Sequence, residues 1–237
     1  MQMRATFWLV LLWTAALAAL TVGCIRLEGF ERSTPTIQYY TLDYPSPPSL
    51  SPNPVAGPLR LKRFDATDAY ATDRIVYTEA GSSTRFYHYQ RWTVSPAAMV
   101  TRLMARDLMV SGLFRAVVRS QVDLHPEYIL TGTLESLQAL QTDAGLETEV
   151  AITVLFYPAG KSREEENNEI FQKRYVVTTP CGDKKPESIV RSMNEGMEKL
   201  SREMLQDLAA RLRPGTDART GARGSGASTA VQGPSSE

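Results

Sequence analysis

Very few side chains in this sequence could carry out covalent or acid–base chemistry. The 237 residues include two histidines, His88 and His125, and two cysteines, Cys24 and Cys181. Neither histidine stands in a metal-ligand spacing such as HExxH, no GxSxG motif is present, and no motif links Cys181 to a histidine. We therefore expect a protein that is not an enzyme, with no catalytic residues, no metal site and no cofactor.

Cys24 ends a segment that is typical of an export signal. Arg4 supplies a positive charge, residues 5–19 form an apolar run interrupted by two threonines, and small residues lead into Cys24. The run is shorter than the about 20 apolar residues that a transmembrane helix needs. Residues 21–24, Thr-Val-Gly-Cys, resemble the lipobox of bacterial lipoproteins, although Leu is commoner at the position of Thr21.

The resemblance to a lipobox implies that residues 1–23 are a signal peptide and that Cys24 is lipidated. In such signals the cysteine receives a diacylglyceryl group, the preceding segment is removed, and the new amino terminus is acylated with a fatty acid such as palmitate. Several acyl chains anchor a protein stably, whereas a single chain does so only marginally. The alternative is a retained N-terminal membrane helix, but polar sequence without a cluster of Lys and Arg follows Cys24.

The residues after Cys24 bear on where the chain is anchored. Ile25 stands where an Asp retains lipoproteins in the inner membrane of enteric bacteria, so the resemblance implies an anchor in the outer membrane, on its periplasmic face. Residues 24–38 would form a tether that spans roughly 45–50 Å when extended. With Cys24 lipidated, Cys181 lacks an intramolecular partner, which leaves either an exposed unpaired thiol or an intermolecular disulfide.

Charge and composition restrict the remaining classes of function. The chain carries 26 basic and 26 acidic residues, so there is no electrostatic case for binding nucleic acid. Apolar residues make up 43% of it, which suffices for one domain over residues 39–213. Residues 45–58 hold six of the fourteen prolines and predict an extended surface linker. Residues 214–237 are rich in Gly, Ser, Thr and Ala and lack aromatic residues, so we expect a disordered tail.

Periodicity predicts two amphipathic helices and several strands. Ser95 as N-cap, Pro96 as the first helical residue and Gly112 as the stop delimit one helix, and apolar residues three and four apart predict another over residues 186–212. Alternating or β-branched runs predict strands over residues 39–43, 59–64, 74–78, 85–90, 114–119, 128–140, 147–157 and 169–179. The third and fourth of these form a hairpin, and Gly132 marks a bulge or bend. The expected class is α+β, a single domain with a mostly antiparallel sheet covered by two main helices.

One stretch of the sequence resembles a known family. The run FYHYQRWTVSPAAMVTRLMARDLMVSGLF, residues 86–114, combines an aromatic-rich strand, Arg-Trp, a proline, an amphipathic helix, Ser-Gly and Phe. It resembles the auxiliary lipoproteins of ABC-type transport systems, the group that includes paraquat-inducible protein C. YYTL at 39–42, RIVYT at 74–78, LTGTL at 130–134 and the closing helix agree in order, so the resemblance spans about residues 39–212.

The family resemblance implies a non-enzymatic periplasmic subunit. It would work with an inner-membrane ABC permease and ATPase and a substrate-binding MCE-domain protein, and would help to move phospholipid or other hydrophobic molecules between membranes. The alternative is an outer-membrane lipoprotein that assists lipopolysaccharide or β-barrel protein assembly. The transported substrate and the oligomeric state stay open.

The aromatic-rich strand supplies the candidate docking residues. We expect Tyr87, Tyr89, Arg91 and Trp92, with His88 among them, to contact the partner, because Tyr, Trp and Arg are frequent in interface hot spots. The alternative is that Trp92 and one face of the strand belong to the core of the sheet.

Overall fold

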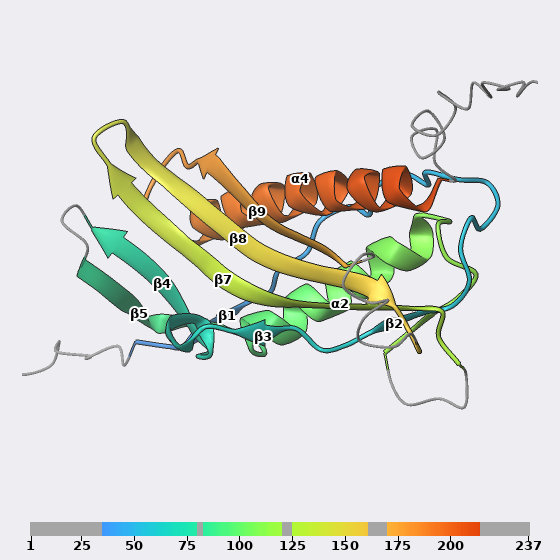
Figure 1. The fold of residues 1–237 in the computed structure, drawn as a ribbon. Helices are drawn as coiled ribbons and strands as arrows, with labels where there is room; N and C mark the ends of the chain where they lie inside the picture. The colour runs from blue at the N-terminus through green and yellow to red at the C-terminus, as the bar shows by residue number, and fades with distance from the viewer. Residues whose placement is uncertain (1–34, 80–82, 120–124, 161–169, 214–237) are drawn as a thin grey trace, which may run out of the picture. The chain divides into compact units, whose positions relative to one another are not determined.

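The computed structural model describes residues 35–79, 83–119, 125–160 and 170–213. The predicted signal peptide, Cys24, the predicted disordered tail and most of the charged loop before residue 170 lie outside these ranges. Ile37–Glu237 cluster as one unit, whose described part is a curled mixed sheet with two long helices on one face (Figure 1). The predicted α+β class and single domain are confirmed.

The described sheet has nine strands, and β1-β5-β4-β7-β2-β6 is its main hydrogen-bonded path. On either side of this path β3 pairs with β7, and β8 joins β7 to β9. The strands are β1 Gln38–Tyr40, β2 Leu59–Leu61, β3 Asp65–Ala66, β4 Arg74–Glu79, β5 Ser83–Trp92, β6 Val117–Val118, β7 Tyr128–Thr142, β8 Gly145–Pro158 and β9 Phe171–Pro180. The predicted strands are all present, but β1, β2 and β6 are shorter than their sequence patterns suggested.

The long ladders of the sheet are antiparallel, whereas its parallel pairings are short. β7 pairs with β8 from Tyr128↔Pro158 to Thr142↔Gly145, and β8 pairs with β9 from Glu147↔Pro180 to Phe156↔Phe171. Parallel pairings of two or three residues place β1 beside β5, β4 and β3 beside β7, and β2 between β6 and β7. Parallel neighbours need a crossover connection, and the segment containing α2 (Pro96–Val110) supplies one. The sheet is therefore more mixed than predicted.

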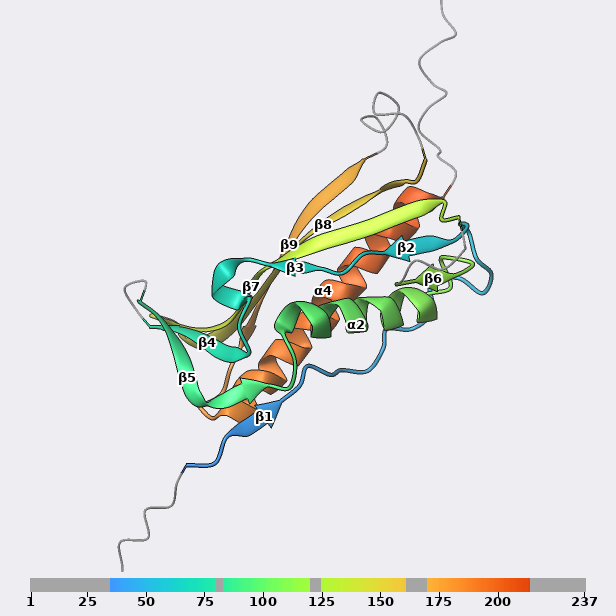
Figure 2. The ribbon, with the colours of Figure 1, turned by 90° about the horizontal axis from the view of Figure 1, so that it is seen from below.

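Helices α2 and α4 (Pro186–Leu212) cover the same face of the sheet (Figure 2). Pro96 opens α2, and Gly112, with φ of +71°, follows its end in the left-handed conformation that glycine favours, both as predicted. The predicted side-chain cap is not formed, because Ser95 Oγ makes no hydrogen bond to the helix amides and instead accepts one from Arg63 Nη2 at 3.5 Å. The second helix spans the residues predicted for it.

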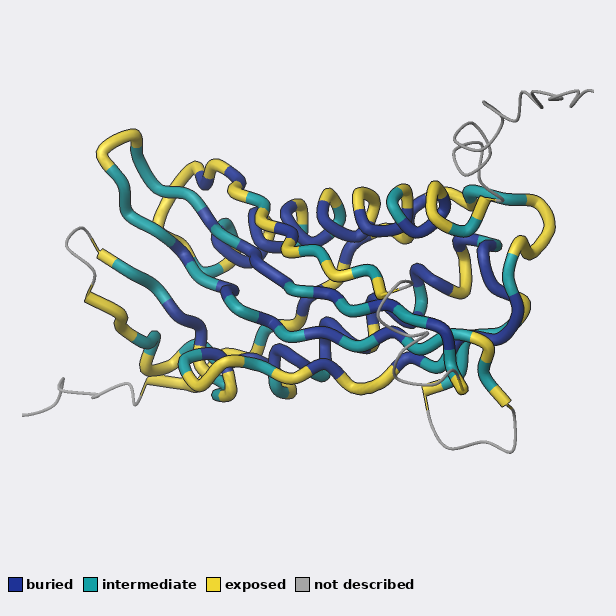
Figure 3. The backbone as a smooth tube through the Cα atoms, in the orientation of Figure 1, coloured by how far each residue is buried: buried dark blue, intermediate teal, exposed yellow. Residues whose placement is uncertain are grey.

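The hydrophobic core lies between these helices and the inner face of the sheet (Figure 3). The buried stripe of α4 faces β8 and β9 and consists of Met193, Met197, Leu200, Met204 and Leu208, each 0% exposed. Burying one such side chain stabilises a fold by about 1.5–3 kcal/mol. The long helix is thus held by packing along most of its length.

The proline-rich segment 45–58 contains no helix and no named strand, but it bends at several residues and is docked onto the domain. The amides of Leu50 and Val55 donate to the carbonyl oxygens of Ser111 and Leu113, at 2.9 and 3.1 Å. Pro47 within it is buried. These contacts fix the segment against the chain that follows α2.

Gly132 is not the site of the bulge in β7. The register between β7 and β8 shifts between Leu134 and Ser136 instead. A Cβ atom at Gly132 would lie only 2.3 Å from the ring of Phe64. Glycine is therefore required here because the ring packs directly on the strand backbone.

The carboxylate of Glu135, beside this bulge, is stabilised in its charged form by hydrogen bonds. Its carboxylate accepts one hydrogen bond from Thr153 Oγ1 and one from Arg174 Nε. The hydroxyl and the guanidinium stabilise the charged form and lower the pKa of Glu135 below its ordinary value. The carboxylate thereby connects β7 to β8 and β9.

A buried carboxylate connects the amino-terminal part of the domain to both helices. Asp107 is 0% exposed, and its Oδ2 accepts hydrogen bonds from Tyr44 Oη and Ser201 Oγ, each at 2.6 Å. Its Oδ1 accepts from Arg106 Nε at 2.9 Å. Burial and the charge of Asp107 raise the pKa of Tyr44 far above its ordinary value, so the phenol remains a donor.

Candidate functional site

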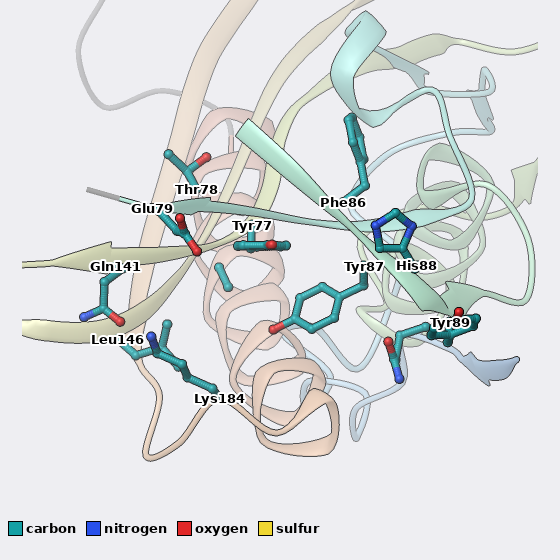
Figure 4. A pocket seen from close by; sticks show the side chains of 12 residues that line it. Tyr77, Thr78, Glu79, Phe86, Tyr87, His88, Tyr89, Gln141, Leu146 and Lys184 are labelled. Carbon is teal, nitrogen blue, oxygen red and sulfur yellow. The ribbon is translucent and has the colours of Figure 1, made fainter. Parts of the chain in front are cut away.

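A cavity of about 470 Å³ opens among the β4–β5 hairpin, the β7–β8 hairpin and the turn before α4 (Figure 4). In Figure 1 both hairpins extend past the amino-terminal end of α4. We call this cavity the hairpin hollow. It is lined by Tyr77, Thr78, Glu79, Phe86, Tyr87, His88, Tyr89, Gln90, Ala139, Gln141, Leu146 and Lys184.

Strand register assembles the apolar wall of the hairpin hollow. The rings of Tyr77 and Tyr87 come from neighbouring strands, and their centroids lie 4.9 Å apart. The parallel pairing of β4 with β7 sets Tyr77 opposite Ala139, which also lines the hollow. Leu146 and Lys184 complete the wall from the start of β8 and from the turn before α4. Segments distant in the sequence thus form one largely apolar concave surface.

The structure divides the predicted docking residues into two groups. Tyr87, His88 and Tyr89 line the hairpin hollow together, and Tyr89 is 46% exposed. Arg91 lies outside the hollow, and its Nη1 pairs with Asp73 Oδ2 at 2.9 Å. Trp92 is 1% exposed and belongs to the core, which corrects its placement among the contact residues. A buried indole cannot touch a partner, so the alternative of a core residue applies to Trp92.

Among the described residues, one edge of β5 is unpaired for most of its length. β1 pairs with β5 only at Gln90–Trp92, through the register Gln38↔Gln90 to Tyr40↔Trp92. Between Ser83 and Tyr89, no other described strand pairs with β5 on the side away from β4. Such an edge presents backbone donors and acceptors that another strand could use.

The hairpin hollow carries few charges. Glu79 Oε2 pairs with Arg85 Nη2 at 3.3 Å. Lys184 is exposed and forms no ion pair with another described residue, whereas the neighbouring Lys185 pairs with Asp183 at 3.6 Å. The cavity therefore has an apolar wall, one compensated carboxylate and one uncompensated ammonium group within the described part of the chain.

Burial raises the pKa of Tyr87. Its proximity to Tyr77 and Cys181 raises that pKa further. A phenol is neutral at pH 7 even with an ordinary pKa of about 10, so the hydroxyl group is a hydrogen-bond donor at neutral pH. The hollow can therefore bind an apolar group and offer a few polar contacts at its mouth.

Cys181 is buried, which corrects the expectation of an exposed thiol. Its amide donates to the carbonyl oxygen of Leu146 at 2.9 Å, and its Sγ donates to the carbonyl oxygen of Asp183 at 3.1 Å. These bonds fold the turn back onto the sheet, so only 9% of the residue is exposed. Burial raises the pKa of the thiol, which lowers its reactivity.

The residues that could do acid–base chemistry are not gathered at this site. His88 lines the hairpin hollow, but His125 precedes β7 and is not part of the lining. Within the described ranges, no cluster of three or more His, Cys, Asp and Glu side chains could hold a metal ion.

Sequence reasoning missed Tyr77, Leu146 and Lys184. Tyr77 stands in a predicted strand, so the alternation of RIVYT could have placed it on one face. The hairpin with β5 was predicted, but no local signal could have placed that face beside β7, because the pairing of β4 with β7 joins residues about 60 positions apart. The sequence therefore identified one wall of the hollow and not the cavity.

Comparison with solved structures defines the class of fold. Protein XCC0632 from Xanthomonas campestris has a TM-score of 0.60 at 13% identity, covering 71% of this chain and 92% of that chain. A second, uncharacterized protein has a TM-score of 0.55 at 12% identity, covering 73% of this chain and 99% of that chain. No curated protein matches the sequence. At these identities the likeness concerns the fold alone.

The family follows from the sequence match. The family described as ABC-type transport auxiliary lipoprotein component matches residues 40–205, which include every residue that lines the hairpin hollow. This chain belongs to that family, as the resemblance predicted. It is thus a lipoprotein component of an ABC-type transport system. In the described ranges, no helix is long and apolar enough to cross a membrane.

Proposed function

We propose that this protein is anchored through Cys24 in the outer membrane, faces the periplasm and serves an ABC system that contains an MCE-domain protein. It would help to move phospholipid or other hydrophobic molecules by docking a partner, without catalysing a reaction. The family match over residues 40–205 carries the proposal. The lipobox-like residues 21–24 and the absence of an Asp after Cys24 support the anchor and its location.

The geometry of β5 favours the β4–β5 hairpin as the docking surface. Its open edge between Ser83 and Tyr89 can accept a strand from a partner, as in β-augmentation, where backbone hydrogen bonds provide affinity. Tyr89 projects beside this edge with 46% of its surface exposed. Tyrosine is enriched in hot spots because a large rigid ring combines apolar area with a polar group.

Site-specific photocrosslinking tests this docking surface. A photoreactive amino acid replaces Tyr89 in one variant and Val176 in another; Val176 is 42% exposed but lies on β9, at the other edge of the sheet. We expect the MCE-domain protein to be captured from position 89 and not from position 176. Capture of only a β-barrel assembly protein from position 89 would instead favour the alternative role in assembly. Equal capture of the MCE-domain protein from both positions would contradict docking through the hairpin.

The anchor and the lack of catalysis have separate tests. A Cys24→Ala variant should no longer fractionate with the outer membrane or support transport, and retention of both would contradict the anchor. A hydrolase assay in which His88→Ala and His125→Ala abolished turnover would contradict a purely binding role.

A further inference from the structure

We propose that the hairpin hollow binds the acyl chain of a single-chain anionic amphiphile, with the ammonium group of Lys184 near the anionic head. A long-chain fatty acid is the simplest member of this class. The proposal rests on the proposed function, because it assigns to the docking subunit a direct contact with the transported class of molecule.

The shape and lining of the hollow suit an acyl chain. Its volume of about 470 Å³ lies within the range of roughly 300–1,000 Å³ that is usual for small-molecule sites. The rings of Tyr77 and Tyr87, 4.9 Å apart, form one apolar wall, and Leu146 stands in the same lining (Figure 4). Ala139, which also lines it, is 1% exposed and belongs to the core. The hollow therefore extends the hydrophobic core past the amino-terminal end of α4.

The charges around the hollow favour an anionic head group. The carboxylate of Glu79 is paired with Arg85 Nη2 at 3.3 Å, so its charge is partly offset. Lys184 lacks an ion pair with any described residue and stands in the lining. An apolar wall next to an uncompensated ammonium group matches a molecule with a hydrocarbon chain and a negative end. An apolar side chain of a protein partner would fill the wall but would leave the charge of Lys184 unused.

The test uses the whole mature chain, residues 24–237, with Cys24→Ser so that no acyl chain of the protein competes. The probes are laurate and dodecyltrimethylammonium, which share a twelve-carbon chain and carry opposite charges, and binding is measured by titration calorimetry below their micelle concentrations. Lys184→Gln is compared with Lys185→Gln, which makes the same charge change one residue away and outside the lining. Leu146→Asn is compared with Val176→Asn, on the far edge of the sheet. Thermal melts verify that each variant is folded.

We expect saturable binding of laurate that is tighter than that of dodecyltrimethylammonium. Each CH₂ added from octanoate to laurate should tighten binding about two- to fourfold. Lys184→Gln should weaken the binding of laurate about two- to fivefold and should not weaken the binding of dodecyltrimethylammonium. Lys185→Gln should change the affinity for neither probe. Leu146→Asn should weaken both probes, and Val176→Asn neither.

Three results would overturn the proposal: no saturable binding of laurate, the same loss in both lysine variants, or no difference between Leu146→Asn and Val176→Asn. The crosslinking from Tyr89 reports separately on partner docking. Partner capture without laurate binding would reject the amphiphile site alone. Laurate binding without partner capture would reject the docking surface and leave the hollow as a binding site.

Discussion

Replacing the buried Asp107 by Asn should destabilise the domain strongly. Oδ2 accepts from two hydroxyl groups, those of Tyr44 and Ser201, while Oδ1 accepts from Arg106 Nε at 2.9 Å. An amide has a single acceptor oxygen, so its NH₂ group must face either the two hydroxyl donors or the guanidinium. Asn keeps the size of the side chain, and the effect therefore reports on charge and hydrogen bonding rather than on a cavity.

The structure indicates the magnitude of this loss. The side chain of Arg106 is 28% exposed and also pairs with Asp43 at 3.3 Å, so the arginine keeps a partner and the cost lies in the hydrogen bonds of the buried carboxylate. A hydrogen bond to a charged group contributes about 1.5–3 kcal/mol, so losing the equivalent of two of the three costs about 3–6 kcal/mol. For a domain of this size each kcal/mol lowers the melting temperature by about 2–4 °C, so we expect a fall of about 6–24 °C. Tyr44→Phe removes one hydrogen bond to the carboxylate and should cost about 1.5–3 kcal/mol. Urea unfolding at 25 °C and thermal melts followed by circular dichroism measure both variants.

Asp73→Asn is the matched control for this prediction. Asp73 also pairs with an arginine, Arg91, but its side chain is 45% exposed. Exposed ion pairs contribute about 0–1 kcal/mol, so the control should melt within about 4 °C of the unmodified protein. The reasoning about the buried network is refuted when Asp107→Asn melts at the same temperature as Asp73→Asn.

The remaining predictions concern single positions in the sheet and the turn before α4. Gly132→Ala should lower stability by about 1–3 kcal/mol in urea unfolding, because its Cβ would overlap a packed ring, whereas Gly182→Ala, with nothing within 4 Å, should be neutral. Glu135→Gln should lower stability at pH 7 and progressively less as the pH falls below about 4.3, because the contribution of a carboxylate with a lowered folded-state pKa is lost as the pH falls through that pKa; a loss that does not shrink with falling pH would contradict this. In the Cys24→Ser chain, Cys181 should react with a thiol reagent at least about tenfold more slowly in the native protein than in urea, and a rate unchanged by urea would show an exposed thiol.

The helices could be predicted because their signals are local. Pro96 and Gly112 act through backbone conformation within a residue or two of each helix end, and the apolar spacing of residues 186–212 needs no partner to be recognised. Strand positions were predictable for the same reason. The short parallel pairings were not, because they depend on how the α2 segment returns the chain to the sheet.

The candidate site shows where alternation fails as a guide. Arg74 pairs with Arg91 and Val76 with Phe86, so two positions along β4 correspond to five along β5. This irregularity disturbs the period of two along β5, where Phe86 and Tyr87 are both half-buried and the next two residues are both exposed, so alternation alone could not show which residues of the strand are buried. Cys181 was misplaced for a related reason, since a turn-like sequence does not reveal that the turn is hydrogen-bonded to the start of β8.

The parallel pairing of β1 with β5 has a mechanical consequence. A pull on Gln38 along the axis of β1 loads its hydrogen bonds to β5 together, because those bonds lie across the direction of force. A few residues after β1, the amide of Asp43 donates a hydrogen bond to Asn194 Oδ1 on α4 at 3.0 Å. The hydroxyl of Tyr44 donates one to Asp107 Oδ2 on α2. Tension that enters through the amino terminus is thus shared among the sheet and both helices, and the edge strand resists being peeled away.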